Sequence, residues 1–275
     1  EVNGKYDEAR KTLKALIAST QNEKIKDRAS AELDGLQYLD DLNRSESYYK
    51  VKNLELLNTP AAEFSPVFLN NELYFTSTRG NGKIYEATGT PFSDLYKVAS
   101  RGANVDLATI APLPDGINSE NINDGTITFS PDGKVMVFAK GNTGRKKGAA
   151  DVDLYLSRFR NGSWTEPIPL NINDPEGWDS TPAFSPDGRT LYFSSNRKLR
   201  GRQATSYGGL DLYSAQMDSR GRFSRVKNLG PEINTPGNEL FPYMADDMKL
   251  YFSSDGHPGY GGLDLFVVKR ANGRT

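Results

Sequence analysis

One acidic residue recurs at the same position in each of four sequence repeats, three positions before the start of a predicted strand. Gathered at one mouth of a ring, four such carboxylates could hold a cation or a basic segment of a partner. Because Asp and Asn also bond turn backbones, and because every repeat carries the residue, a structural role in its own loop is the favoured interpretation. The acids are Glu63, Asp124, Asp179 and Glu239, and the asparagines preceding them are Asn58, Asn118, Asn173 and Asn234.

A second carboxylate recurs in the strand pattern D-L-[YF]. We interpret it as structural, and we expect it to pair with Ser, Asn or Arg groups near Arg79 and Arg197. Its four copies are Asp94, Asp153, Asp211 and Asp264.

The sequence lacks the residue patterns of the common hydrolytic enzymes. A His-based triad would need His257, which is the only histidine, and nothing marks its partners. There is no G-x-S-x-G, no H-E-x-x-H and no phosphate-binding glycine loop ahead of a helix. Two glycosidase carboxylates need different environments, whereas the carboxylates here are repetitive. We therefore predict a protein that is not an enzyme, with no catalytic residue, no cofactor and no metal.

Loops that differ between the repeats are the other candidates for recognition, because rigid scaffolds commonly carry function on variable loops. Two of them are basic and could bind an acidic partner or a phosphate, and aromatic side chains in the others could anchor a partner. The alternative is that these loops are only solvated and flexible. The basic candidates are Arg145, Lys146, Lys147, Arg200 and Arg202, and the remaining ones are Trp178, Tyr207, His257 and Tyr260.

Four copies of one strand-rich unit position these residues, at a period of roughly 55 to 60 residues that is typical of propeller blades. Two copies contain a Ser-Pro-Asp-Gly turn, at 130–133 and 185–188, which should close a hairpin because Pro fixes φ and Gly accepts a positive φ. The apolar runs after these turns read as central strands. Further hairpin signals at Asn161-Gly162, Arg220-Gly221 and Asn272-Gly273 add a fourth strand to each blade. We predict an all-β propeller of four-stranded blades over residues 46–275.

The first 45 residues have a different pattern. Apolar residues at helical spacing predict one amphipathic helix from Gly4 and a second after the polar break at 19–22. We therefore expect a helical pair over residues 1–45. It either ends an array of helical repeats or is a hairpin packed on the propeller.

Segment 48–60 is similar to segment 223–236, which is the predicted outermost strand of the third blade and its exit loop. An outer strand before the first unit could complete the last blade and close a ring of four. The last repeat also carries the turn signal for a fourth strand of its own near 272–275, which would favour an arc of a larger ring. Both interpretations stay open.

Charge and composition exclude some classes of partner. The 275 residues carry a formal net charge of -1, so there is no general basic field for nucleic acid. No stretch is apolar enough for a membrane span, and residues 1–10 lack the basic-then-apolar order of a signal peptide. The absence of Cys leaves the redox compartment open. We predict a soluble protein with no nucleic-acid partner and no direct membrane span.

The repeat F-S-P-D-G-[KR]-x-[LV]-x-[FY], followed by G-G-x-D-[LI]-[YF], resembles the WD40-like PD40 repeat of TolB-type propellers over residues 48–275. The opening G-x-Y-x-x-A at Gly4, Tyr6 and Ala9 resembles the end of a tetratricopeptide repeat. Together they are similar to the helical-repeat and propeller region of OmpA-family envelope lipoproteins from Bacteroidetes that belong to the type IX secretion apparatus.

This resemblance implies a periplasmic scaffold, associated with the outer membrane, that docks envelope or outer-membrane proteins. In that family a lipid anchor and a peptidoglycan-binding OmpA-like domain flank these parts, and neither is found in this sequence. Contact with peptidoglycan is therefore expected only through such domains. The alternative functions are a propeller that binds a glycan or a cation and, less favoured, a propeller hydrolase or glycosidase.

Overall fold

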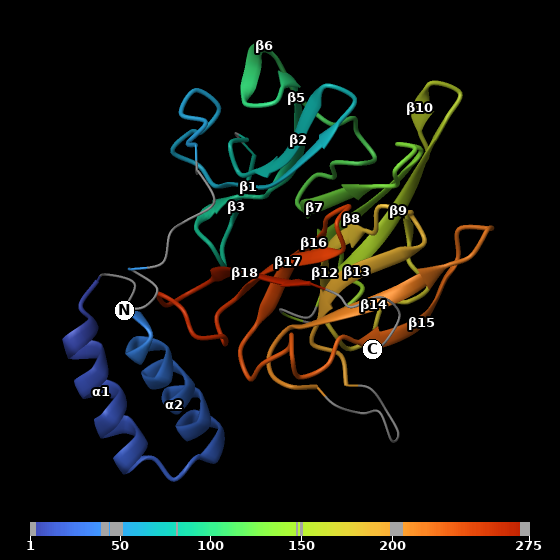
Figure 1. Cartoon of the computed structure of the whole chain (residues 1–275). Helices are drawn as coiled ribbons and strands as arrows, with labels where there is room; N and C mark the ends of the chain where they lie inside the picture. Colours follow the sequence, from blue (N-terminus) through green and yellow to red (C-terminus); the bar gives the residue numbers. More distant parts are fainter. Residues whose placement is uncertain are drawn as a thin grey trace.

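Two helices precede a series of antiparallel sheets in the computed structural model (Figure 1), which describes residues 4–39, 44, 52–80, 82–146, 148, 151–198 and 206–269. The helices are α1 (Tyr6–Ser19) and α2 (Glu23–Gln37). No helix in the described ranges is long and apolar enough to cross a membrane. The predicted helical pair is confirmed. The predicted domain boundary between residues 45 and 46, like the predicted turn at 272–273, lies outside the described residues.

The strands form five sheets, of which the four larger ones are called blades 1 to 4 in chain order. Blade 1 contains β1 (Glu63–Leu69), β2 (Glu72–Ser77), β5 (Asp94–Arg101) and β6 (Asn104–Pro112), and a small hairpin of β3 (Ile84–Tyr85) and β4 (Thr90–Pro91) branches from it. Blade 2 contains β7 (Asn123–Phe129), β8 (Val135–Gly141), β9 (Val152–Arg160) and β10 (Ser163–Trp164), with β11 (Ile168–Pro169) also paired to β9. Blade 3 contains β12 (Asp179–Phe184), β13 (Thr190–Ser195), β14 (Asp211–Met217) and β15 (Phe223–Asn228). Blade 4 contains β16 (Glu239–Met244), β17 (Lys249–Ser254) and β18 (Asp264–Lys269).

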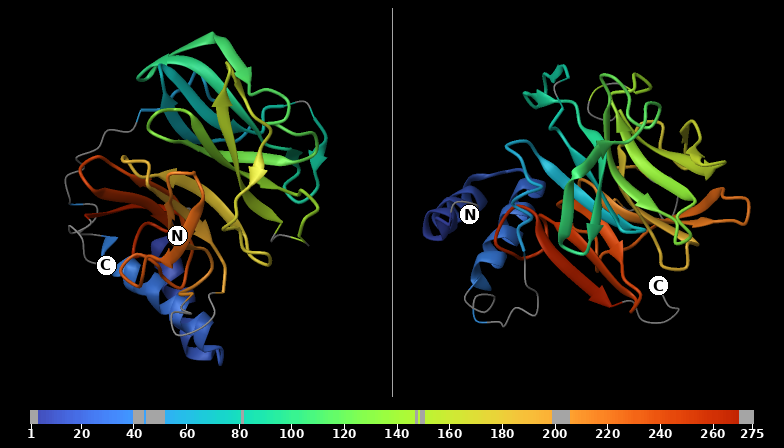
Figure 2. Two further views of the ribbon diagram at one scale, coloured as in Figure 1. Left: turned by 90° about the vertical axis from the view of Figure 1, so that its right-hand side faces the viewer. Right: turned by 90° about the horizontal axis from the view of Figure 1, so that it is seen from above.

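The four sheets follow one another around the body, as the left view of Figure 2 shows from blue-green through green and orange to red. The predicted all-β propeller with a short helical pair is therefore confirmed. Three blades have at least four strands, whereas blade 4 has three among the described residues. β7 packs against β1 and β2, β12 against β7, and β16 against β12. No contact of comparable extent joins blade 4 to blade 1 in the described part of the chain.

The predicted turns close the first hairpin of blades 2 and 3. Gly133 and Gly188 have φ values of 67° and 68°, which glycine adopts without a steric penalty. Ahead of Gly133, the hydroxyl of Ser130 donates to the Asp132 carboxylate at 2.6 Å and accepts from the Val135 amide at 2.9 Å. The serine and aspartate of the motif therefore bond the turn backbone.

The first strand of every blade contains one residue with a positive φ that is not glycine. In each strand the pairing with the second strand shifts register at this point, which is the mark of a β-bulge. The same distortion in four blades shows that it belongs to the repeat and not to one local sequence. The residues are Ser65, Thr126, Thr181 and Phe241, with φ of 53°, 49°, 46° and 51°.

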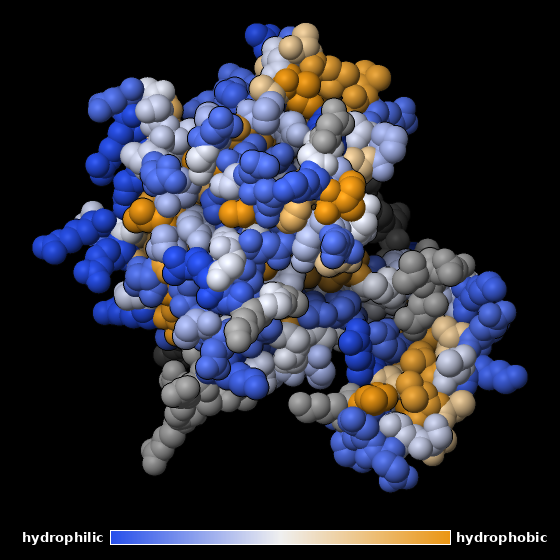
Figure 3. All heavy atoms as spheres, turned by 180° about the vertical axis from the view of Figure 1, so that it is seen from behind, coloured by the Kyte–Doolittle hydropathy of each residue, from blue (hydrophilic) through white to orange (hydrophobic). Residues whose placement is uncertain are grey.

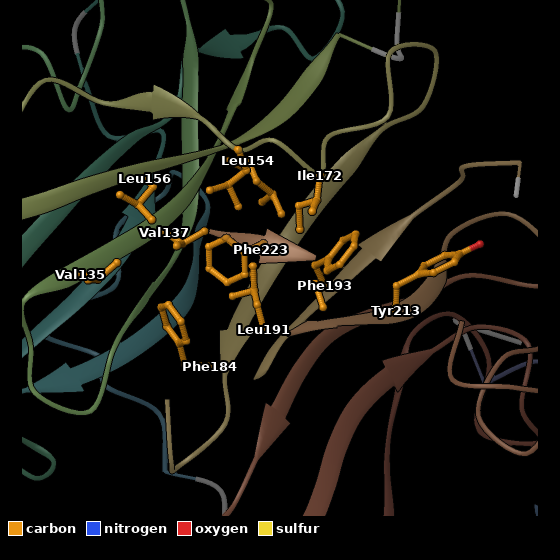
Figure 4. Close-up of a cluster of buried hydrophobic side chains, with 13 residues drawn as sticks. Val135, Val137, Leu154, Leu156, Ile172, Phe184, Leu191, Phe193, Tyr213 and Phe223 are labelled. Atoms are coloured by element: carbon orange, nitrogen blue, oxygen red, sulfur yellow. The ribbon is translucent and has the colours of Figure 1, made fainter. Parts of the chain in front are cut away.

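Apolar side chains fill the space between neighbouring blades. Between blades 2 and 3, Val137 and Leu154 pack with Leu191 and Phe193 (Figure 4). Tyr192, which lies between Leu191 and Phe193 in β13, points the other way and packs with residues of blade 4. Because side chains alternate along a strand, each central strand contributes to two junctions.

The helical pair contacts the loops of blade 4. Arg28 of α2 lies 3.6 Å from the carboxylate of Asp255. At Gly35 a Cβ atom would lie 3.3 Å from the backbone of Pro258, so the small residue permits close packing of the helix on this loop. Arg10 of α1 donates to the Leu36 carbonyl at 2.8 Å, which ties the two helices together.

Candidate interaction site

The repeated acid of blade 3 belongs to a buried ion pair. Asp179 starts β12, and its carboxylate accepts a hydrogen bond from Arg197, which follows β13 by two residues. Arg197 also donates through Nη2 to the carbonyl of Ile172 at 3.0 Å and lies over the ring of Phe193, 4.8 Å from its centroid. Because Ile172 belongs to the loop arriving from blade 2, the pair joins two strands of one blade to the preceding blade.

We call such a set a junction pair, and we call the loop that leads into the first strand of a blade a connecting loop. The connecting loops span residues 53–59, 113–119, 170–174 and 229–235. Each one contains one of the repeated asparagines and ends ahead of one of the repeated acids.

Blade 1 has the same arrangement. Arg79 lies 3.1 Å from the carboxylate of Glu63 and donates to the Leu57 carbonyl at 3.0 Å. Glu63 also accepts from the amide and hydroxyl of Thr59 at 3.1 and 2.6 Å. Burial would raise the pKa of Glu63, but these hydrogen bonds, one from Ser77 and the Arg79 charge outweigh it and lower the pKa.

Blade 2 uses lysine in place of arginine. The ammonium of Lys140 lies 2.7 Å from the Asp124 carboxylate and donates to the Ile117 carbonyl at 2.6 Å. Both side chains are almost fully buried. Burial raises the pKa of Asp124 to about 7, although the Lys140 charge acts in the opposite direction.

Blade 4 uses the single histidine at the same place. A ring nitrogen of His257 lies 2.8 Å from the Ile233 carbonyl, and the ring packs between Phe252 and Phe266. Glu239 accepts from the amide and hydroxyl of Thr235 at 3.0 and 2.6 Å and from the hydroxyl of Ser254 at 2.7 Å. Burial raises the pKa of Glu239, and these hydrogen bonds oppose the shift.

The four repeated acids therefore bond groups of their own junctions. Glu63, Asp179 and Glu239 are the first residues of their strands, and Asp124 is the second. Among the described residues, no group of three or more His, Asp or Glu side chains is placed to hold a metal ion. This geometry joins blades together. Whether the same residues also bind a partner stays a hypothesis.

The second repeated acid does not bond Arg79 or Arg197 in the hydrogen bonds and ion pairs of the described residues. Asp153 pairs with Lys146 at 2.7 Å and lies 3.5 Å from Arg145. Asp211 accepts from the Tyr207 amide at 2.9 Å, and Asp264 accepts from the Tyr260 amide at 2.6 Å. In these blades it bonds the loop that precedes its own strand. Asp211 also accepts from the side-chain amide of Asn228 at 2.8 Å, so in blade 3 it has an asparagine partner of the expected kind.

These contacts show that one of the basic residues predicted to lie on a variable loop surface is buried. The ammonium of Lys146 is directed inward to Asp153 and to the Gly177 carbonyl, so it is buried and not part of an open basic surface. Arg145 remains half exposed. Lys147, Arg200 and Arg202 lie outside the described residues, so the predicted basic patch as a whole is untested.

The aromatic candidates occupy different settings. Trp178 is partly buried and its amide donates to Asn196 at 2.7 Å. Tyr207 is partly buried, whereas Tyr260 is exposed on the loop that faces α2. His257 is on the same loop, but its ring belongs to the junction pair of blade 4. Trp178 and Tyr207 precede strands of blade 3, and His257 and Tyr260 precede a strand of blade 4. That these side chains anchor a partner stays a prediction.

Reasoning from the sequence missed the groove between the helices. It is a hollow of about 550 Å³. The residues that line it belong to α1 and α2, except for Lys5, which directly precedes α1. Its apolar lining is Ala9, Leu13, Leu16, Ile25 and Ala29, and its charged rim is Lys5, Glu8, Arg28 and Glu32. Figure 3 shows these apolar side chains as an orange patch among hydrophilic ones. The amphipathic pattern of the two helices is the signal in the sequence that indicates an apolar face here.

Comparison with known proteins gives similarity only at the level of solved structures. No family model matches the chain, and no curated protein matches it. Among solved structures, TolB from Acinetobacter baumannii is 15% identical, with 78% of this chain and 42% of that chain covered and a TM-score of 0.47. A putative TolB from Agrobacterium tumefaciens is 16% identical, with 72% and 62% covered and a TM-score of 0.44. An alpha-L-arabinofuranosidase from Lactobacillus brevis is 13% identical, with 74% and 70% covered and a TM-score of 0.47.

The chain thus spans less than two thirds of the length of either TolB chain. Proteins named as TolB and a protein named as a glycosidase are both among the structures to which it is similar.

Proposed function

We propose that this chain is a non-enzymatic protein-interaction scaffold that docks a helical segment of another protein in the groove between α1 and α2. The observation that carries the proposal is the open apolar side of α1. None of the 14 residues of this helix is buried, although its sequence is amphipathic. An apolar helix face of this kind is stable in water when another element covers it.

The shape and chemistry of the groove fit an amphipathic helix. Leu16 of α1 and Ile25 of α2 both line the hollow and remain 39% and 45% exposed, so a partner could bury both. Docking of a helix into an apolar groove places its own apolar residues at i, i+3, i+4 and i+7 on such a floor. The rim carries both signs of charge, with Lys5 and Glu8 3.7 Å apart, and therefore favours a partner helix with mixed charges.

The non-enzymatic part of the proposal is supported by the junction pairs. A catalytic carboxylate needs access to substrate, whereas Asp124, Asp179 and Glu239 are 0% exposed and bonded to their own loops. The propeller would then serve as a rigid base, and its contact with α2 through Asp255 and Pro258 would hold the groove in a fixed orientation.

The location and assembly follow from the resemblance of the repeats and helices. We propose that the scaffold works in the periplasm, associated with the outer membrane, and that its partners are envelope or outer-membrane proteins of a type IX-like secretion assembly. The support is the PD40 pattern over residues 48–275 together with the tetratricopeptide-like opening at Gly4, Tyr6 and Ala9.

Partner capture with matched variants tests the proposal. Leu16→Asp with Ile25→Asp places charges on the groove floor at two exposed positions. The control is Lys11→Asp with Lys14→Asp, two exposed residues of α1 that do not line the groove. Cross-linking in a bacterial envelope extract should give one helical segment that is linked to the wild type and the control at least tenfold more than to the groove variant.

Equal capture by all three proteins would contradict the proposal. Capture that is lost only when the propeller loops are changed would place recognition on the blades instead. Circular dichroism of each variant checks that the helical pair has remained folded.

A further inference from the structure

One face of blade 4, the face directed away from blade 3, is apolar. In blades 1, 2 and 3 the corresponding face is covered by the next blade. The leucine after the aspartate of the third strand is 0% exposed in blades 1, 2 and 3, where it is Leu95, Leu154 and Leu212. At the same position of blade 4, Leu265 is 73% exposed. Tyr243 and Val267, which share this face through the register of β16, β17 and β18, are exposed as well. All four blades have this apolar face, and three of the faces are covered. We therefore expect that another element covers the fourth.

In the three covered cases an asparagine of the connecting loop bonds the backbone of that leucine. Asn234 accepts from the Leu212 amide at 2.7 Å and donates to the Leu212 carbonyl at 3.0 Å. Asn173 makes the same two bonds to Leu154 at 3.0 and 2.9 Å, and Asn118 to Leu95 at 2.9 and 3.0 Å. We call this pair of bonds the asparagine clamp. It fastens each connecting loop to the blade that it leaves.

A fourth copy of this loop exists ahead of blade 1 without a clamp. Residues 57–59 read Leu-Asn-Thr, as 233–235 read Ile-Asn-Thr. The side chain of Asn58 donates to Asn53 at 2.6 Å, which matches the bond of Asn234 to Asn228 at 2.7 Å. Yet Asn58 is exposed, whereas Asn234 is buried.

The contacts of this loop with the blade that follows it, blade 1, are already formed. Leu57 is buried against Leu73, Phe75 and Val98 of blade 1, and its carbonyl accepts from Arg79. Blade 1 therefore carries half of a junction, namely a connecting loop and its junction pair. The other half, an apolar blade face with a leucine to clamp, is what blade 4 leaves uncovered.

A second position shows the same complementarity. Phe68 of β1 is 57% exposed, whereas its counterparts Phe129 and Phe184 are each 8% exposed inside a junction. Phe129 packs on Tyr74 of the preceding blade, with ring centroids 4.7 Å apart. By the repeat, the counterpart of Tyr74 that would meet Phe68 is Tyr251 of blade 4.

We propose that the connecting loop 53–59 is the element that covers the open face of blade 4, with Asn58 clamping the backbone of Leu265. This fourth junction closes the ring within one chain, burying Leu265 and bringing Phe68 onto Tyr251. The inference is independent of the helical groove, because it rests on the repeated junctions of the propeller alone.

Hydrogen exchange at single amides of the full chain tests the proposal, because the clamp takes the Leu265 amide as donor. In the wild type, exchange at Leu265 should be slowed to a rate within about tenfold of that at Leu212. Asn58→Ala should accelerate exchange at Leu265 about tenfold and leave Leu212 unchanged. Asn58→Asp keeps the acceptor oxygen and should preserve most of the protection. Asn234→Ala is the matched control, with the reverse effect on the two amides.

Three results would overturn the proposal. Exchange at Leu265 as fast as in an unstructured peptide would mean that nothing covers this face. Protection that Asn58→Ala does not change would assign the cover to another element, such as a further blade. Protection that increases with protein concentration would assign it to a second copy of the chain.

Discussion

The junction pairs of blades 3 and 4 have the same geometry but different chemistry. In blade 3 the permanently charged Arg197 meets the buried Asp179, whereas in blade 4 His257 reaches the arriving loop and Glu239 is held by Thr235 and Ser254. Both side chains reach the carbonyl of the arriving loop, at 3.0 Å from Arg197 to Ile172 and 2.8 Å from His257 to Ile233.

The difference shows what the repeat requires at this position. Both residues place a nitrogen against a loop carbonyl and pack on an aromatic ring, Phe193 in one blade and Phe252 in the other. A fixed positive charge is present in only one of them. The shared element is therefore a hydrogen-bonding connection between blades, which is a structural task that two chemistries can perform.

The largest expected effect is the loss of the blade 3 pair. Arg197→Met should lower the free energy of unfolding by about 3–5 kcal/mol, because it leaves a carboxylate buried without its partner. Arg79→Met in blade 1 should cost less, since Glu63 and Arg79 are both more exposed than the blade 3 pair. Urea denaturation of both variants measures the difference. A cost for Arg197→Met of less than about 1 kcal/mol would show that this pair does not hold the junction.

A smaller loss is expected in blade 4. His257→Ala should cost about 2 kcal/mol, from one hydrogen bond and the packing of the ring between Phe252 and Phe266. His257→Gln retains a donor for the Ile233 carbonyl and should recover about half of that loss. The same denaturation experiment compares them, and an equal cost for both variants would rule out the hydrogen bond as the reason.

The pH dependence of stability sharpens the comparison through blade 2. The pKa of Asp124 is about 7 in the folded chain against an ordinary value of 3.8, because burial disfavours the carboxylate. Between these values the folded state binds more protons than the unfolded state. The free energy of unfolding should therefore fall as pH rises from 4 to 7, by at most about 1.4 kcal/mol per unit from this group.

Asp124→Asn removes this contribution. Denaturation of both proteins at pH 5 and pH 7 isolates it, because groups whose pKa is unchanged by the substitution cancel in the difference. The wild type should lose more stability over this interval than the variant. Parallel behaviour of the two proteins would contradict the raised pKa.

The smallest effect concerns the first turn. Blades 2 and 3 place Gly133 and Gly188 at a positive φ, whereas blade 4 places Met248 there with φ of 65°. Met248→Gly should stabilise the chain by about 1 kcal/mol, because glycine adopts this conformation without a steric penalty. Gly188→Ala is the opposite control and should destabilise, since its Cβ would lie 2.9 Å from Pro131. Thermal denaturation that places both variants on the same side of the wild type would refute this account.

Local signals explain how much of the fold could be predicted. The turns at 130–133 and 185–188 and the amphipathic helices are encoded by neighbouring residues, so they were predictable. The repeated positive φ was not, because Ser65, Thr126, Thr181 and Phe241 share no residue type that favours it. It coincides with the register shift between the first and second strands, which these residue types do not encode.

The candidate site was less accessible to sequence reasoning, because its partners meet only after two strands have paired. The acids were visible as a repeat, but the residues beside them that bond the loop carbonyls differ in type and are Arg79, Lys140, Arg197 and His257. A position two residues after the second strand was the available signal for the two arginines. Lys146 resembled part of an open basic loop, and only the fold shows that it is directed to Asp153.

The most direct test of the central claim, that the repeated acids serve the junctions, is a double-mutant cycle on Asp179 and Arg197. The free energy of unfolding is measured by urea denaturation for Asp179→Asn, Arg197→Gln and the double variant. We predict a coupling energy of about 2–3 kcal/mol, with the double variant losing much less than the sum of the single losses. Additive losses, with a coupling energy near zero, would contradict the structural role assigned to this pair.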